Sequence, residues 1–213
     1  MYRTAPLERY LDDAASGQPT PGGGSVSALV GALAASMAAM AANFTVGKRK
    51  FAAVEPRVRE LLEKIESLRE HLLQLVDQDV NAYGRLSEAF ALPKNTDEEK
   101  HHRSRAIQEA LMVALSVPRQ IVQASRSLLE VLTELVDIAN PNLISDVGVS
   151  AVLAQAALEG GKLNVEINLA SLRDAATVET VRSETQQAAT IASERAAQVL
   201  VKVRAAITRA GNC

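Results

Sequence analysis

The sequence has no tryptophan and few aromatic residues, which make up 3% of its 213 positions, although 47% of its residues are hydrophobic. The apolar content is mainly alanine, leucine and valine, a composition that suits closely packed helices better than aromatic-rich strands. No stretch alternates apolar and polar residues as a half-buried strand does, and no repeat or linker interrupts the chain. We therefore predict a single all-α domain over residues 1–213, with about six helices, several of them long, packed as an antiparallel bundle.

Cysteine and net charge are also scarce. The single cysteine is Cys213, so the chain cannot form an internal disulfide, which fits a reducing compartment. The formal net charge of −2 provides no basic field for nucleic acid. Residues 1–13 contain acidic side chains and no apolar run, so they do not resemble a secretory signal. We expect a cytoplasmic protein without a nucleic-acid partner.

Charged residues are missing from residues 25–47, a segment long enough to span a bilayer. Alanine, serine, glycine and methionine dominate it, whereas membrane insertion is favoured by leucine, isoleucine, phenylalanine and valine. We interpret it as a helix buried on all sides within the protein, with a membrane span as the alternative. Its small residues let another helix lie very close, which favours a homodimer formed through helix faces over a monomer.

Prolines and capping residues divide the rest of the chain. Pro56 fits the first turn of a long helix that ends before Pro93, and Thr96 with Glu99 forms a capping box for the next helix. Pro118 lies inside that helix and predicts a kink or a break. The other expected helices cover residues 3–16, residues 25–47 with Ser25 as N-cap, and about 177–207. A further helix is expected to start at Ser145 or Asp146, and Gly160 and Gly161 disfavour its continuation to Leu172.

The stretch PTPGGGS, residues 19–25, places three glycines before a helix. Without side chains, Gly22, Gly23 and Gly24 let backbone N–H groups approach an anion or a planar ligand, and the helix dipole favours negative charge there. The phosphate-binding pattern GxxxxGK[ST] is absent, and no strand precedes the glycines as in dinucleotide-binding folds. A plain hinge or a close-packing device is the alternative.

Polar residues at apolar positions are the next candidates. Asp79 lies on a core-facing helix stripe, where a carboxylate is either paired or has a raised pKa suited to moving protons. Asp77 lies off this stripe and is expected to be solvated. Asp146 either caps a helix or acts in a site. Asn164 and Asn168 share one helix face, where their amides need partners from each other, the backbone or a ligand.

Lys48, Arg49 and Lys50 follow the uncharged helix, either as a solvated turn or as a clamp for a ligand carboxylate. They lie on the order of 35 Å from Gly24 along that helix, so one ligand reaches both ends only if it is long or if a second subunit supplies one of them. The histidines are isolated or adjacent in sequence, so no metal site is expected. No serine has a histidine partner at the spacing of a hydrolase triad.

Residues 7–174 contain, in this order, segments that resemble one family: TPGGGSVSALVGALAASMAAMAANFTVGKRK, LPKNTDEEK, and NPNLISDVGVSAV with ALEGGKLNVEINLASL. They are similar to the C-terminal part of the formiminotransferase-cyclodeaminase family, which includes stand-alone methenyltetrahydrofolate cyclohydrolases. The resemblance implies an all-helical homodimer that acts on a tetrahydrofolate one-carbon adduct and needs no metal or redox cofactor.

The resemblance also implies the reaction. The stand-alone architecture and the segment ALPKNTDEEK favour hydrolysis of 5,10-methenyltetrahydrofolate to 10-formyltetrahydrofolate, by acid/base-assisted addition of water at the methenyl carbon. The alternative is the formimidoyltetrahydrofolate cyclodeaminase reaction, in which the ring closes and ammonia is released. A non-catalytic helical folate-binding or scaffolding protein is a further alternative.

Within this resemblance we assign Asp79 or Asp146 as the catalytic proton carrier. We expect the asparagine pair to contact the edges of the pterin and the lysine cluster to hold the glutamyl tail. The predicted substrate-binding residues are Gly22, Gly23, Gly24, Ser25, Asn43, Lys48, Lys50, Asn164 and Asn168.

Overall fold

Residues 1–210, the part of the chain that the computed structural model describes, form six α-helices and three short 3-10 helices, with no strand among them. The expected all-α architecture is confirmed, whereas Cys213 lies outside the described residues. The α-helices are α1 (Leu7–Ala15), α2 (Gly23–Asn43), α3 (Glu55–Ala91), α4 (Asp97–Ile138), α5 (Ile144–Leu169) and α6 (Ala175–Ala210). The 3-10 helices are Tyr2–Thr4, Arg49–Phe51 and Pro141–Leu143.

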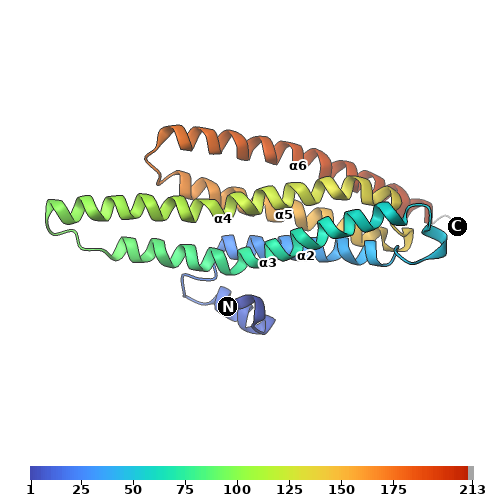
Figure 1. The fold of residues 1–213 in the computed structure, drawn as a ribbon, viewed down its shortest axis with the longest axis horizontal. Coiled ribbons are helices and arrows are strands. Elements are labelled where there is room, and N and C mark those ends of the chain that lie inside the picture. Colours follow the sequence, from blue (N-terminus) through green and yellow to red (C-terminus); the bar gives the residue numbers. More distant parts are fainter. Residues whose placement is uncertain (211–213) are drawn as a thin grey trace.

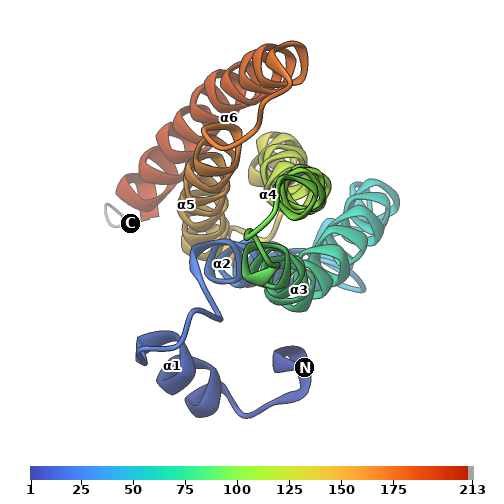
Figure 2. The same ribbon diagram turned by 90° about the vertical axis from the view of Figure 1, so that its left-hand side faces the viewer.

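Helices α2 to α5 form a four-helix bundle in which α2 packs on α3 and α5, and α4 packs on the same two helices. Short connections join them, so consecutive helices run antiparallel (Figure 1). Helix α6 covers α4 and α5, and α1 with the N-terminus lies outside the bundle, on the side of α2 and α3 (Figure 2). The first residues of α2 and the last residues of α3 and α5 therefore lie toward the same end of the molecule.

Small residues let α2 and α5 pack closely. A Cβ atom added to Gly160 would lie 2.3 Å from Ser27 Oγ of α2, and one added to Gly161 would lie 3.2 Å from Ile121 of α4. The glycines of α5 are thus contact points at helix crossings, where a side chain would force the backbones apart. This packing explains why α5 continues through both glycines to Leu169, although glycine disfavours a helix interior.

The prolines and the capping box act largely as predicted. Thr96 Oγ1 accepts the Glu99 N–H, and the Glu99 carboxylate accepts the Thr96 N–H, so the capping box at the start of α4 is confirmed. Pro56 lies in the first turn of α3. The predicted break at Pro118 is wrong, because α4 runs continuously through that proline, which is buried between neighbouring helices.

Two expectations about α2 are corrected by the structure. Its N-cap is Gly22 rather than Ser25, which lies inside the first turn. The helix is also not buried on all sides, because only one face contacts the bundle. The large apolar residues on the other face are between 38% and 49% exposed: Val26, Leu33 and Met40.

Two helical segments are long and apolar enough to cross a membrane by length and composition, Gly23–Asn43 and Pro141–Leu169. Within their most apolar windows, 61% and 44% of the residues are buried inside the protein. A core helix of a soluble protein passes the same test, so this is weak evidence for a span.

Candidate active site

A cavity of about 330 Å³ opens where α2 begins. Helices α3 and α4 are much longer than α2 and extend past its first turn (Figure 1). Four segments far apart in the sequence contribute to the wall of the cavity. The lining residues are Pro19, Thr20, Gly22, Gly23, Gly24, Asp79, Ala82, Tyr83, Leu86, Phe90, Leu111, Ala114, Asn164, Ile167, Asn168 and Ser171.

Of the described residues that line this cavity, Asp79 alone carries a carboxylate. Its Oδ2 accepts the backbone N–H of Ser25 at 2.9 Å, and in this way a side chain of α3 caps the first turn of α2. Burial raises the pKa of Asp79 above its ordinary value, and the hydrogen bond from Ser25 partly opposes that rise. A half-buried carboxylate with a raised pKa is suited to exchanging protons with a bound molecule.

Gly24 is required for this arrangement. A Cβ atom at Gly24 would lie 2.1 Å from Asp79 Oδ1 and 2.6 Å from its Cγ, which is far inside contact distance. At Gly23 the corresponding atom would lie 3.3 Å from Asn164 Nδ2. The two glycines therefore let the backbone of α2 pack directly against polar side chains of the cavity, whereas approach of this backbone to a ligand stays a prediction.

The Ser25 side chain links α1 to α3 close to Asp79. The Ser25 hydroxyl donates to the Val76 carbonyl at 3.0 Å, and the Tyr10 hydroxyl lies 3.0 Å from the same Ser25 Oγ. Tyr10 is 4% exposed, and burial raises the pKa of its hydroxyl, with a smaller contribution from the charge of Asp79. Helix α1 is therefore linked to the first turn of α2, where the Ser25 N–H donates to the Asp79 carboxylate.

Asp77 is buried, and the expectation that it is solvated is wrong. It is 7% exposed, and its Oδ1 accepts the backbone N–H of Tyr2 at 2.5 Å. The reason is tertiary: the N-terminal residues fold over this part of α3 and cover a position that the helix pattern alone places outside the core.

Asn164 and Asn168 also line the cavity, and Asn164 lies directly against Gly23. Asn164 Nδ2 donates to the Gly160 carbonyl at 2.8 Å, and Asn168 Nδ2 donates to the Asn164 carbonyl at 2.9 Å. Asn168 Nδ2 also lies 3.4 Å from the carbonyl of Ala114, which Pro118, four residues later, cannot bond because it lacks an N–H. The amide nitrogens are thus engaged by backbone, which orients the amide oxygens as acceptors for a ligand.

The other predicted site residues lie toward the opposite end of the bundle. Asn43, Lys48 and Lys50 are exposed at or beyond the C-terminal end of α2. Asp146 lies in the first turn of α5 without making a cap, about 27 Å from Asn164 along the helix at 1.5 Å per residue. Within one chain, the structure therefore brings the glycines, Ser25, Asp79 and the asparagines together and leaves these four residues apart.

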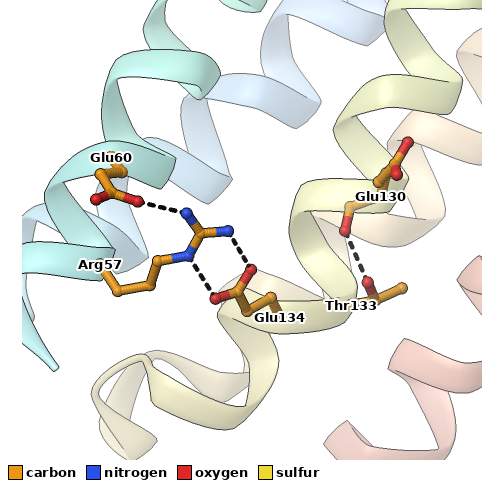
Figure 3. A network of polar contacts seen from close by, with 5 residues as sticks. All are labelled: Arg57, Glu60, Glu130, Thr133 and Glu134. Atoms are coloured by element: carbon orange, nitrogen blue, oxygen red, sulfur yellow. Dashed lines mark hydrogen bonds and ion pairs between the residues drawn. The ribbon is translucent and has the colours of Figure 1, made fainter.

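A larger groove of about 940 Å³ lies between α3, α4 and α6, but its charged side chains mostly pair with one another. Arg57 binds Glu134 through two hydrogen bonds of 2.6 and 2.8 Å and also contacts Glu60 (Figure 3). Pairing with Arg57 lowers the pKa of Glu134. Such exposed, mutually satisfied ions hold two helices together at the surface, so we place the candidate site in the smaller cavity.

Sequence reasoning missed two aromatic residues of the site. Tyr83 and Phe90 line the cavity and remain 42% and 49% exposed. They follow Asp79 by four and eleven residues, which places all three on one face of α3. That spacing is a signal readable from the sequence, because residues four and eleven positions apart share one helix face.

The sequence is similar to those of known proteins. The sequence model of the formiminotransferase-cyclodeaminase family matches residues 6–187. A methenyltetrahydrofolate cyclohydrolase of Methylorubrum extorquens is 41% identical over 173 residues, which are 81% of this chain and 83% of that protein. The formimidoyltransferase-cyclodeaminase of Rattus norvegicus is 33% identical over 94% of this chain, which spans 37% of the rat protein.

A solved structure is also similar. The crystal structure of formiminotetrahydrofolate cyclodeaminase from Thermotoga maritima matches with a TM-score of 0.79 at 30% identity, over 97% of each chain. The resemblance stated from the three sequence segments is confirmed, and the chain belongs to the formiminotransferase-cyclodeaminase family.

Proposed function

We propose that this chain is an enzyme of folate one-carbon metabolism that hydrolyses 5,10-methenyltetrahydrofolate to 10-formyltetrahydrofolate. The observation that carries the proposal is the half-buried carboxylate of Asp79, which has a raised pKa and lies against the glycines of α2 inside the cavity. The similarity to a protein named methenyltetrahydrofolate cyclohydrolase supports the choice of reaction.

In this mechanism Asp79 carries one proton between two steps. It takes a proton from water as the water oxygen bonds to the methenyl carbon, and the cationic N5–C–N10 bridge becomes a neutral carbinol. Protonated Asp79 then donates that proton to N5 as the bond between carbon and N5 breaks. The hydroxyl loses its proton to solvent as the formyl C=O forms, so one water is consumed and one proton is released.

The rest of the cavity suits the pterin. The amide oxygens of Asn164 and Asn168 are acceptors, and the pterin ring presents an amino group and ring N–H groups as donors. The backbone at Gly22 and Gly23 allows a flat ring to approach closely, with Ser25 supporting the turn behind it. Neither this binding nor the proton transfer needs a metal or a redox cofactor.

The second candidate is cyclodeamination of the formimidoyl adduct, in which N10 attacks the formimidoyl carbon and ammonia leaves. The similarity to the Thermotoga maritima structure, whose protein is named for that reaction, favours it. Both reactions pass through a tetrahedral carbon and use one proton carrier, so the same residues serve either. A folate-binding protein without turnover is the remaining alternative.

One pair of assays separates these candidates. Purified protein is mixed with 5,10-methenyltetrahydrofolate, and the loss of near-ultraviolet absorbance is followed; ammonia is then measured with the formimidoyl adduct. Loss of absorbance that Asp79→Asn abolishes supports the hydrolase, whereas ammonia release selects the cyclodeaminase. Saturable binding without either reaction would leave only the binding role.

We also propose that the protein works as a soluble, cytoplasmic homodimer. Exposed apolar residues on α2 and on the neighbouring α5, among them Leu33, Met40 and Ile167, offer a face for a second copy. An antiparallel partner would be the means by which Asn43, Lys48, Lys50 or Asp146 approaches a bound folate. Asp146 is a proton carrier only under that arrangement.

A further inference from the structure

We infer that Pro118, inside α4, is a positioning residue for substrate binding, because it leaves the Ala114 carbonyl free to hold the Asn168 amide with its oxygen toward the ligand. In a regular helix each carbonyl accepts the N–H four residues later, and proline has no N–H to give. Pro118 is buried and is not one of the residues that line the cavity. This role rests on the proposed function, because it concerns recognition of the same substrate.

Helices α4 and α5 touch directly at this proline. A Cβ atom added to Gly161 would lie 3.4 Å from the Pro118 carbonyl oxygen and 3.2 Å from Ile121, so the two backbones are close there. Because α4 and α5 run antiparallel, the turn of α4 before the proline faces the turns of α5 after the glycine (Figure 1). Ala114 therefore lies beside Asn168, and both line the cavity.

The Asn168 amide is held by one carbonyl from each of these helices. Its Nδ2 donates to the Asn164 carbonyl of α5 at 2.9 Å and lies 3.4 Å from the Ala114 carbonyl oxygen of α4. An amide nitrogen carries two hydrogens, so the two carbonyls engage both of them. Turning the amide over would place its oxygen against two other oxygens. Within residues 1–210 no group donates to Asn168 Oδ1, which is left as an acceptor at the cavity.

The bond across the helices distinguishes Asn168 from its neighbour Asn164. Both amides donate to the carbonyl four residues earlier in α5. Among the described residues, Asn168 alone of the two also reaches an acceptor on another helix. That acceptor is the Ala114 carbonyl, for which an N–H at position 118 would compete. At 3.4 Å the bond is weak, so its loss should change ligand affinity by a small factor rather than abolish binding.

The fixed amide selects for a particular edge of the ligand. The pterin presents an amino group and ring N–H groups as donors, and the Asn168 oxygen accepts from such groups. A reversed amide would instead place its own N–H groups against these donors. Asp79 lies on α3 and is not part of this arrangement. Pro118 should therefore affect the binding of the substrate and leave the proton transfer unchanged.

The test is Pro118→Ala, which restores an N–H one turn after the Ala114 carbonyl and so removes the second anchor of Asn168. We expect KM for 5,10-methenyltetrahydrofolate to rise about fivefold, which corresponds to about 1 kcal/mol, with kcat within twofold of the wild type. Ser116→Ala is the matched control, because Ser116 is exposed and lies two residues away on α4. Its KM should equal that of the wild type.

A double-mutant cycle with Asn168→Ala decides whether the effect passes through the amide. Asn168→Ala alone should raise KM about tenfold, and adding Pro118→Ala should then change it by less than twofold. An equal rise caused by Pro118→Ala in both backgrounds would mean that the proline acts through the shape of α4, which would overturn the proposed role. An unchanged KM in the single variant Pro118→Ala would overturn it as well.

The same cycle can be measured without turnover. If the wild-type chain converts neither folate adduct, the proposed reaction fails, and calorimetry gives the Kd of 5-formyltetrahydrofolate for the same four proteins. Binding that Pro118→Ala weakens about fivefold, but only when Asn168 is present, would sustain the role of the proline. Equal Kd values for the wild type and Pro118→Ala would refute that role separately from the reaction, and a wild type that does not bind the probe would refute both.

Discussion

Replacing Gly24 by alanine is expected to remove activity by displacing the proton carrier while leaving the fold intact. The added Cβ would lie 2.1 Å from Asp79 Oδ1, 2.6 Å from Cγ and 2.9 Å from Oδ2. These atoms are the end of a side chain, so the carboxylate rotates away more easily than the helix moves. Rotation breaks the 2.9 Å hydrogen bond from the Ser25 N–H, an interaction with a charged acceptor that contributes about 1.5–3 kcal/mol.

The effects on stability and on activity differ in size. Alanine improves helix propensity by up to about 1 kcal/mol, which offsets part of the lost hydrogen bond, so the free energy of unfolding should fall by no more than about 2 kcal/mol. Loss of a positioned acid/base group lowers rates by about 10² to 10⁴. We therefore expect kcat/KM of Gly24→Ala to fall at least 100-fold, measured by the loss of methenyltetrahydrofolate absorbance, with a normal circular dichroism spectrum.

Gly84→Ala is the matched control. Gly84 lies within α3, and a Cβ atom there would have no neighbour within 4 Å. This variant should retain activity within twofold and gain up to about 1 kcal/mol of stability from helix propensity. Wild-type turnover by a folded Gly24→Ala variant would refute the reasoning, because the carboxylate could then be moved without consequence.

Asp79→Asn should abolish turnover yet raise Tm by a few degrees at neutral pH, as about 1 kcal/mol shifts Tm by roughly 2–4 °C in a domain of this size. The folded-state pKa of Asp79 is raised, so the wild type loses stability as pH rises from the ordinary value of 3.8 through the folded-state pKa. The gain in the variant should therefore vanish below about pH 3.8, and a gain that persists there would contradict the assignment. Tyr10→Phe removes the hydroxyl beside Ser25 and should change the acid limb of the wild-type kcat profile with little effect on KM; an unchanged pH profile would show that α1 does not influence the carboxylate. Leu33→Asp, on the exposed face of α2, should convert the proposed dimer into a monomer in sedimentation velocity, and a wild-type monomer would refute the dimer.

The sequence determined the helices of this protein and its family. Apolar residues at intervals of three and four defined α3 and α4, and the ends of these helices follow from local chemistry at Pro56, Thr96 and Glu99. The three glycines marked a possible close approach of the backbone, but a hinge was the alternative until the structure placed Asp79 and Asn164 against them. These features depend on neighbours within a few residues, so they can be read from the chain.

Only the tertiary structure decided which candidate residues share one site. Asp79 lies against Gly24 and Asn164 lies against Gly23 because α2 begins partway along α3, and Asp146 is remote because α5 starts at the opposite end. Asp77 is buried because the N-terminal segment covers it. Contacts of this kind join positions more than 50 residues apart, and their pairing is fixed by helix lengths and packing, which no local pattern encodes.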